Sequence, residues 1–168
     1  ITTTSRSRGG PRDKHNLVIL SRLPLGEERQ VFHDLVAPPT FRRATSVGGG
    51  DPGENAEIEW DRPFLYARLM LANGRPLHLI NVHLRAPRAA YVAGGKAAGG
   101  GWRTMAGWAE GFFVAAVKRA GQALEVRLFV ETLFDADPEA MIVVCGDFNA
   151  VAYEVPLRTI RGDEEDAG

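Results

Sequence analysis

The sequence predicts a mixed α/β domain in which β-sheet is covered by helices, and three observations carry that prediction. Residues 64–71 (FLYARLML) and 77–84 (LHLINVHL) are two strand-like runs joined by a short turn. Helical character follows over residues 103–135, and the apolar run 141–145 (MIVVC) then has the composition of a buried strand. Antiparallel strands followed by a helix and another strand are typical of sheets packed against helices.

Composition and charge are those of a globular protein. The chain has 168 residues, which suits a single domain over 1–168, with a core at about 14–160 and polar loops at both ends. Its net charge of −1 excludes a global positive field for nucleic-acid binding but allows a local basic groove. A single cysteine excludes an internal disulfide, and no apolar run reaches the ~20 residues of a membrane-spanning helix. A single cysteine without a visible signal segment favours a cytoplasmic location, and the oligomeric state stays open.

The N-terminal half is expected to hold short strands between loops. Proline and glycine mark where these strands end. The predicted elements are a polar loop at 1–16, a strand at 17–20 stopped by Pro24, a strand at 30–37 closed by Pro38, and a turn or flexible loop at 48–54.

The middle of the chain is expected to be a hairpin followed by a loop. Asn73 and Gly74, in the linker 72–76, tolerate the positive φ of tight turns, so the flanking strands should pair antiparallel. Residues 86–101 are rich in glycine and alanine and predict a long mobile loop.

A helix is predicted next, from its apolar spacing. Val126, Phe129, Val130 and Leu133 recur at helical intervals. Three glycines weaken the first half, so we expect one broken helix or two; they are Gly107, Gly111 and Gly121. We interpret the aromatic residues of this half as helix packing rather than base-stacking platforms; they are Trp102, Trp108, Phe112 and Phe113.

Polar residues cluster at the ends of three predicted strands. Side chains two apart in a strand point the same way, so Asp147 should project with Asn149 while Phe148 enters the core. By the same spacing Asn81 should share a face with His83. The third cluster is Ser21 with Arg22.

These residue types suit phosphoryl transfer or phosphoester hydrolysis if the strand ends converge. A carboxylate can align or deprotonate a water, and imidazole exchanges protons near neutral pH. Arginine matches phosphate geometry, and a divalent metal would balance the charge that develops.

Three segments together resemble the endonuclease/exonuclease/phosphatase superfamily. They are LVILSRLPL (17–25), INVHLRAP (80–87) and VVCGDFNA (143–150). That superfamily includes deoxyribonuclease I, abasic-site endonucleases, sphingomyelinases and inositol-phosphate phosphatases. The resemblance implies a four-layer sandwich of two mixed β-sheets with helices outside, and Mg²⁺, or sometimes Mn²⁺, as cofactor.

The resemblance also implies roles for individual residues. Asp147 would activate the attacking water and touch the metal, and Asn149 would position the phosphate or a metal-bound water. His83 would contact the scissile phosphate and assist the leaving group. Further candidates for binding the substrate phosphate are Arg22, Asn81 and Arg85, although Arg22 could instead pair with a carboxylate and Arg85 could be a solvated loop charge.

The sequence departs from the family pattern at several places. Family members carry a metal-binding Glu before the first strand and an Asp-His segment near the end; no Glu precedes residue 17 here, and no His follows Asn149. Arg62-Pro63 stands where the deoxyribonuclease branch has Glu-Pro, with Glu59 and Asp61 as possible substitutes. We therefore expect a family domain incomplete at both ends, weakly active or inactive alone, that binds Mg²⁺ poorly.

The functional prediction is a metal-dependent phosphoesterase acting on a phosphodiester or phosphomonoester. Its substrate would be a nucleic acid or a small-molecule or lipid phosphate. One alternative is a non-catalytic binding or scaffold domain that keeps the fold without the metal-binding Glu. Another is a generic α/β domain with accidental motif matches.

Overall fold

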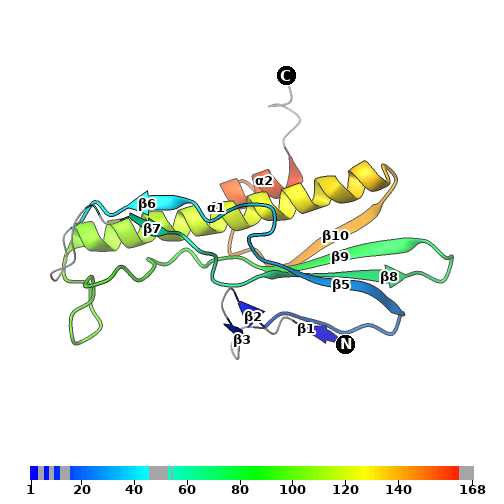
Figure 1. The fold of residues 1–168 in the computed structure, drawn as a ribbon, viewed down its shortest axis with the longest axis horizontal. Helices are drawn as coiled ribbons and strands as arrows, with labels where there is room; N and C mark the ends of the chain where they lie inside the picture. Colours follow the sequence, from blue (N-terminus) through cyan, green and yellow to red (C-terminus); the bar gives the residue numbers. More distant parts are fainter. Residues whose placement is uncertain (4–5, 8–9, 12–15, 46–52, 54, 163–168) are drawn as a thin grey trace, which may run out of the picture.

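The centre of the fold is a four-stranded mixed sheet with strand order β10-β9-β8-β5 (Figure 1). The computed structural model describes residues 1–3, 6–7, 10–11, 16–45, 53 and 55–162. The sheet strands are β5 (Leu25–Val31), β8 (Phe64–Met70), β9 (Pro76–His83) and β10 (Met141–Asp147). The helices are α1 (Met105–Ala136) and α2 (Val155–Arg161). Short strand pairs are β1 (Thr2–Thr3) with β4 (Val18–Ile19), β2 (Arg6–Ser7) with β3 (Gly10–Pro11), and β6 (Thr40–Arg42) with β7 (Asn55–Glu57).

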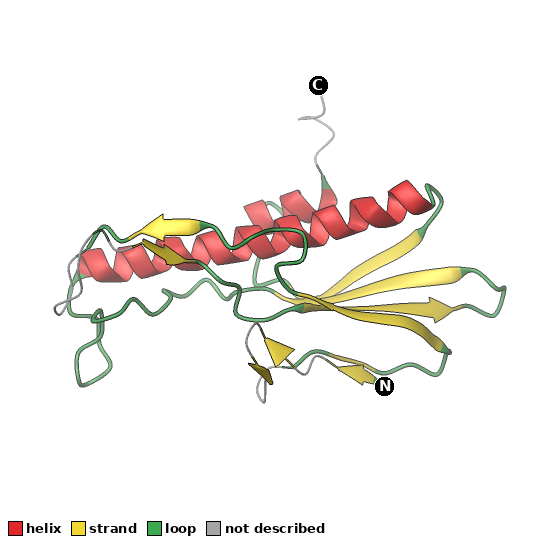
Figure 2. Ribbon diagram, in the orientation of Figure 1, coloured by secondary structure: helices red, strands yellow, loops and turns green. Residues whose placement is uncertain are grey.

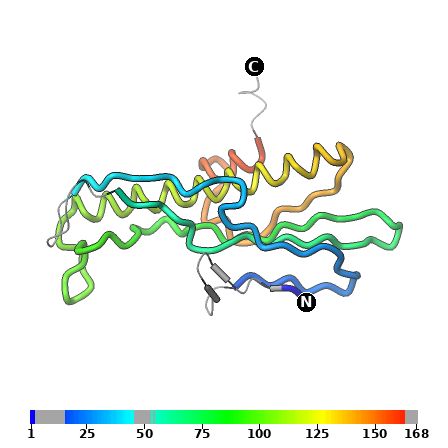
Figure 3. Tube along the Cα trace, in the orientation of Figure 1, coloured from blue at the N-terminus to red at the C-terminus, as the bar shows by residue number. Residues whose placement is uncertain are grey.

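The predicted α/β class is confirmed. Both helices lie on the same side of the four-stranded sheet (Figure 2). The N-terminal segment with β1 and β4 runs along the opposite side (Figure 3). A helix layer, the four-stranded sheet and this short N-terminal ribbon are therefore stacked in that order. A second full sheet stays a prediction. None of the described helices is long and apolar enough to cross a membrane.

Two apolar clusters hold the layers together, one on each face of the sheet. On the helix face, Val126 and Phe129 of α1 pack against Phe64, Tyr66 and Ile80. On the other face, a smaller cluster joins Leu17 and Ile19 to strand β8; its sheet members are Leu65 and Ala67. Alternation along β8 explains the division, because successive side chains point to opposite faces.

The predicted hairpin is confirmed, with its turn shifted by one residue. β8 pairs antiparallel with β9, and residues 71–75 connect them. Gly74 has φ 79°, and its N–H donates to the carbonyl of Leu71 at 2.9 Å. Asn73 Oδ1 accepts the N–H of Arg75 at 3.0 Å. The turn is therefore closed by the residues that the sequence singles out.

The predicted helix is a single unbroken one, so the expectation of a broken helix or two helices is wrong. A Cβ on Gly121 would lie 2.1 Å from the ring of Trp60, and one on Gly111 would lie 2.4 Å from the Ala90 carbonyl. These glycines let other segments approach the helix closely. Their cost in helix propensity is offset by packing, which propensity alone does not register.

The predicted strand at 30–37 is wrong in position. The edge strand β5 spans Leu25–Val31, and its middle residues are exposed and charged, so it carries little apolar pattern. The chain then bends at His33, which has φ 60°. His33 Nε2 accepts the Trp60 N–H at 2.9 Å, so Nδ1 carries the proton and donates to the Val36 carbonyl, also at 2.9 Å. His33 is thus a structural residue that closes this bend.

Three further expectations differ from the structure or fall outside it. Residues 1–16 were expected to be a loop but contain the two-residue strands β1, β2 and β3, and the strand expected at 17–20 is the two-residue β4. The loop 86–101 is irregular as predicted, yet it contacts α1, where the Ala90 N–H donates to the Gly111 carbonyl at 2.8 Å. The turn expected at 48–54 lies, apart from Gly53, outside the described residues, and so do residues 163–168 of the polar C-terminal end.

Replacing Gly121 with alanine is expected to lower the free energy of unfolding by about 1–3 kcal/mol, because overpacking a rigid site outweighs the gain in helix propensity. Urea unfolding followed by circular dichroism measures this change. Gly99→Ala is the matched control, since a Cβ there meets nothing within 4 Å. Equal stability of the two variants would show that Trp60 does not need this close approach.

Candidate functional site

His83 and Asp147 face each other at one edge of the sheet. β9 and β10 are parallel and end together, with His83 as the register partner of Asp147. His83 Nε2 lies 3.6 Å from Asp147 Oδ2, and the two side chains are 29% and 62% exposed. The carboxyl ends of parallel strands are where open α/β sheets place their sites. The convergence of these two predicted residues is therefore a direct result of parallel pairing.

The turn after Asp147 is built by Gly146 and Asn149. Gly146 has φ 125°, and a Cβ there would lie 2.0 Å from the Val82 carbonyl, so only glycine fits. Asn149 has φ 48°, and its N–H donates to Asp147 Oδ1 at 2.9 Å. The Asn149 amide also donates to the Leu84 carbonyl at 2.9 Å. Asp147 and Asn149 are therefore close together, but through a local turn rather than through strand alternation.

Phe148 is partly buried against the helix-side core, as predicted. Asn81 shares a face of β9 with His83, also as predicted. The alternating residues Ile80 and Val82 point to the other face and enter the helix-side core. The Asn81 amide donates to the Val18 carbonyl at 3.1 Å, which ties β4 to β9. Asn81 thus has a structural bond beside the His83–Asp147 pair.

Arg85, predicted to bind phosphate, points to a different place. Its Nη1 donates to Asp61 Oδ2 at 2.9 Å, and Lys118 Nζ donates to Asp61 Oδ1 at 2.9 Å. These groups line a cavity of about 530 Å³ between α1 and the β6–β7 pair. Asp61 is therefore the shared carboxylate of an ion-pair cluster with Arg85 and Lys118.

Arg22 is exposed, and among the described residues no hydrogen bond or ion pair joins it to His83, Asp147 or Asn149. The hydroxyl of its neighbour Ser21 accepts the N–H of Leu23 at 2.9 Å, which forms a local turn. The third predicted cluster is thus not brought to the other two by direct contact.

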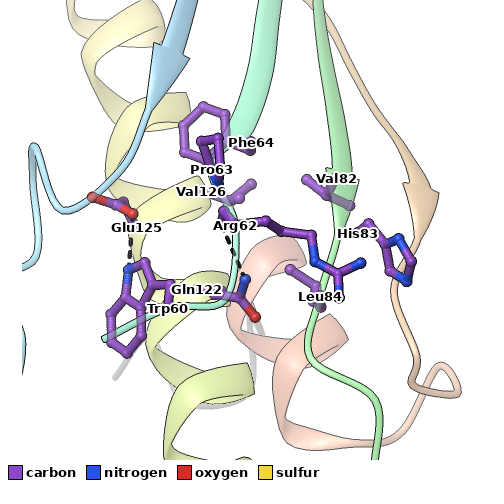
Figure 4. Close-up of a pocket in the computed structure, with 10 residues that line it drawn as sticks. All are labelled: Trp60, Arg62, Pro63, Phe64, Val82, His83, Leu84, Gln122, Glu125 and Val126. Atoms are coloured by element: carbon purple, nitrogen blue, oxygen red, sulfur yellow. Dashed lines mark hydrogen bonds between the residues drawn. The ribbon is translucent and has the colours of Figure 1, made fainter. Parts of the chain in front are cut away.

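Sequence reasoning missed a polar group on the helix side of His83. A small cavity of about 10 Å³ there is lined by Arg62, Gln122 and Glu125 (Figure 4). Figure 4 shows the Arg62 guanidinium directed toward the end of β9, where His83 lies. The sequence does hold an indication of this group. Gln122, Glu125 and Phe129 follow the spacing of a helix core (i, i+3, i+7), and polar residues within an apolar helix stripe are uncommon.

Glu125 and Gln122 are occupied by structural bonds. Glu125 is 1% exposed and accepts the Trp60 indole N–H at 3.0 Å and the Leu35 N–H at 3.2 Å. Gln122 Oε1 accepts the Arg85 N–H at 2.8 Å. These side chains therefore position the start of β8 and the end of β9 relative to the helix.

Oxygen donors for a metal are present at the sheet edge, but they form a partial set. Asp147 offers an exposed carboxylate and Asn149 a neighbouring amide. Within the described ranges, no group of three or more His, Cys, Asp and Glu side chains is arranged to hold a metal ion. Mg²⁺ keeps several waters and takes one or two carboxylates from proteins. A carboxylate and an amide are therefore ligands of a suitable kind for Mg²⁺, but two of them bind it only weakly.

Cys145 is half-buried in β10, beside Asn81 in the register. Burial raises the pKa of the Cys145 thiol, so the thiol stays protonated and is not activated as a nucleophile. The reactive groups of this edge are therefore the imidazole and the carboxylate.

No protein-family model, no curated protein and no solved structure matches this chain.

The ion pairs of Asp61 predict a stability that depends on pH. Burial raises the pKa of this carboxyl, but the hydrogen bonds and charges of Lys118 and Arg85 outweigh burial, so the pKa lies below its ordinary value. A lowered pKa in the folded state gives stability that is present at neutral pH and is lost as pH falls below about 4.

Asp61→Asn should lower the free energy of unfolding at pH 7 by about 1–3 kcal/mol, because it leaves two partly buried cations without their anion. Between about pH 5 and pH 3, a range that spans the ordinary carboxyl pKa, the free energy of unfolding should fall less in this variant than in the wild type. Urea unfolding at both pH values measures this, with the exposed Asp135→Asn as control. Parallel losses in wild type and Asp61→Asn would contradict the role given to the cluster.

Proposed function

We propose that this protein is a phosphoester hydrolase whose reaction centre is the His83–Asp147 pair. The observation that carries the proposal is the 3.6 Å separation of His83 Nε2 and Asp147 Oδ2 at the shared end of β9 and β10. That distance exceeds a direct hydrogen bond and is short enough for both groups to contact one phosphoryl group and its attacking water. The motif resemblance of residues 80–87 and 143–150 supports the same chemistry.

In the proposed reaction, a water attacks phosphorus in line with the leaving oxygen. Asp147 Oδ2 orients this water and accepts its proton, while the bond from phosphorus to the leaving oxygen breaks. Protonated His83 gives its proton to the leaving oxygen, so the charges balance at the end of the step. Asn149 helps to hold the Asp147 carboxylate in place through its N–H on Oδ1.

Mg²⁺, or Mn²⁺, is proposed as the cofactor, with Asp147 and Asn149 as the ligands from this chain. Bound there, the metal would neutralise negative charge on the phosphoryl oxygens. The exposed Asp147 oxygen leaves space for a cation that keeps most of its waters. Nucleic acid and small-molecule or lipid phosphates remain the two proposed substrate classes, with diester or monoester bonds.

The four-layer sandwich is proposed on the same resemblance. Met141 and Val143 are 36% and 42% exposed on the sheet face opposite the helices. This is apolar surface that a second sheet would bury, as sheet-on-sheet packing does. In that arrangement the His83–Asp147 edge would lie at the rim between the two sheets.

Asp147→Asn is expected to lower kcat/KM by about 10²–10⁴-fold, because the carboxylate loses its capacity to accept a proton. The assay measures Mg²⁺-dependent hydrolysis of plasmid DNA, abasic DNA, sphingomyelin and inositol phosphates by the full-length protein. His83→Ala should cause a loss of similar size, and the exposed Asp135→Asn should leave turnover unchanged. Activity that survives both substitutions at the sheet edge would refute the proposed centre.

A non-catalytic binding domain is the second candidate, and one observation favours it. The Asn149 amide donates to the Leu84 carbonyl, and the Asn81 amide donates to the Val18 carbonyl. Asn81 and Asn149, two polar residues of the resembling segments, thus make hydrogen bonds that stabilise the fold. Binding of a non-hydrolysable phosphoester that Asp147→Asn leaves intact, with no turnover on any substrate of the panel, would establish this candidate instead.

A further inference from the structure

The first three turns of α1 expose only apolar side chains. Within residues 105–116, the polar Glu110 is buried, and every exposed residue is alanine, methionine or aromatic. We call this surface the apolar face; its members are Met105, Ala106, Trp108, Ala109, Phe112, Phe113 and Ala116. The three-and-four-residue spacing of most members places them on one continuous side of the helix. The sequence favours helix packing for Trp108, Phe112 and Phe113; the structure leaves all three exposed, with Phe113 in contact with Phe41 at 5.3 Å between ring centroids.

The exposure of the large members is substantial. Met105 is 73% exposed and Phe113 51%, followed by Phe112 at 41% and Trp108 at 38%. A helix on the surface of a globular protein ordinarily turns polar residues to the solvent. A contiguous exposed apolar patch marks an interaction surface.

Basic residues outnumber acidic ones in the segment that carries the apolar face. Residues 85–124 contain six lysine and arginine residues and one acidic residue, Glu110. The Glu110 carboxylate is buried and accepts the N–H groups of Ala44 and Thr45. Arg85 and Lys118 both form ion pairs with the one carboxylate of Asp61, and two side-chain nitrogens of Arg119 are buried. The other basic residues of the segment are Arg88, Lys96 and Arg103. The chain as a whole has a net charge of −1, so this segment is a local concentration of positive charge.

Two of these cations are placed beside the helix by the loop that precedes it. Lys96 Nζ lies 4.1 Å from the ring centroid of Trp102, and Arg103 Nε donates to the Lys96 carbonyl at 3.0 Å. Trp102 itself reaches α1, since a Cβ on Gly111 would lie 3.0 Å from its ring. Gly111 is three residues from Trp108, so this basic loop borders the apolar face.

We propose that the apolar face and its basic border dock on the surface of an anionic phospholipid bilayer. The aromatic and methionine side chains would enter the boundary between headgroups and acyl chains, and the cations would contact lipid phosphates. Aromatic and aliphatic residues on one helix face with lysine and arginine at its rim are the chemistry of such interfaces. This inference goes beyond the proposed hydrolysis and does not depend on it.

The same observations disfavour two other occupants. Trp108 and Phe112 stack on each other, with ring centroids 5.4 Å apart and planes at 26°, which removes a ring face that a nucleic-acid base would use. Met105 and the alanines have no ring at all. A second copy of the chain would bring the same basic border against itself, and like charges across an interface are repulsive.

Vesicle co-sedimentation of the whole chain tests the proposal. Phosphatidylcholine vesicles are compared with vesicles that also contain phosphatidylglycerol, at low and high salt. We expect binding to the anionic vesicles only, weakened by salt because exposed charges are screened. Trp108→Ser with Phe112→Ser should weaken it about tenfold or more, because two buried aromatic side chains are lost from the lipid contact. Arg88→Gln with Arg103→Gln should weaken binding to anionic vesicles as well.

Tyr153→Ser is the matched control, since Tyr153 is 80% exposed but lies outside the apolar face. Thermal unfolding confirms that each variant is folded. The proposal is overturned if the aromatic variants bind anionic vesicles as the wild type does. It is also overturned if the wild type binds neither kind of vesicle. If the same variants then abolish self-association or single-stranded DNA binding, the face is assigned to a second copy or to nucleic acid.

Discussion

The parallel pairing of β9 with β10 is the constraint on which the rest of the structure depends. Parallel neighbours need a long crossover, and here α1 supplies it. The pairing requires glycine at position 146, where the β10 backbone comes against the Val82 carbonyl. It also sets His83 opposite Asp147 and turns Phe148 into the helix-side core. One backbone register thus fixes both the packing and the polar edge.

Helix α1 is the second organising element, because its buried polar side chains hold irregular segments in place. Glu110 binds the backbone of residues 44–45, and Glu125 binds the backbone of Leu35 and the indole of Trp60. Segments without regular structure need partners for their backbone N–H groups, and carboxylates are strong acceptors for them. Glycines on the same helix let Trp60 and Ala90 approach it. The helix is therefore a scaffold on several sides, and its sequence is not simply amphipathic.

The polar edge and the exposed end of α1 are separate in chemistry. At the edge, an imidazole and a carboxylate meet with an amide close by, which suits proton transfer around a phosphoryl group. The first turns of α1 expose apolar side chains, and residues 85–124 carry six basic residues and one acidic residue, which suits attraction to an anionic surface. Each property comes from a different stretch of chain, so each can be altered by substitution without the other.

The sequence by itself determined the hairpin, the strand before Gly146 and a helix that ends near residue 135, and it placed His83 and Asp147 at strand ends without setting them side by side. These features depend on local spacing and turn chemistry, which are readable from neighbours in the chain. Only the tertiary structure decided that Arg85 pairs with Asp61, that Asn149 turns toward Leu84, and that the helix continues through its glycines. Those outcomes rest on contacts between residues far apart in sequence, whose distances no local pattern encodes.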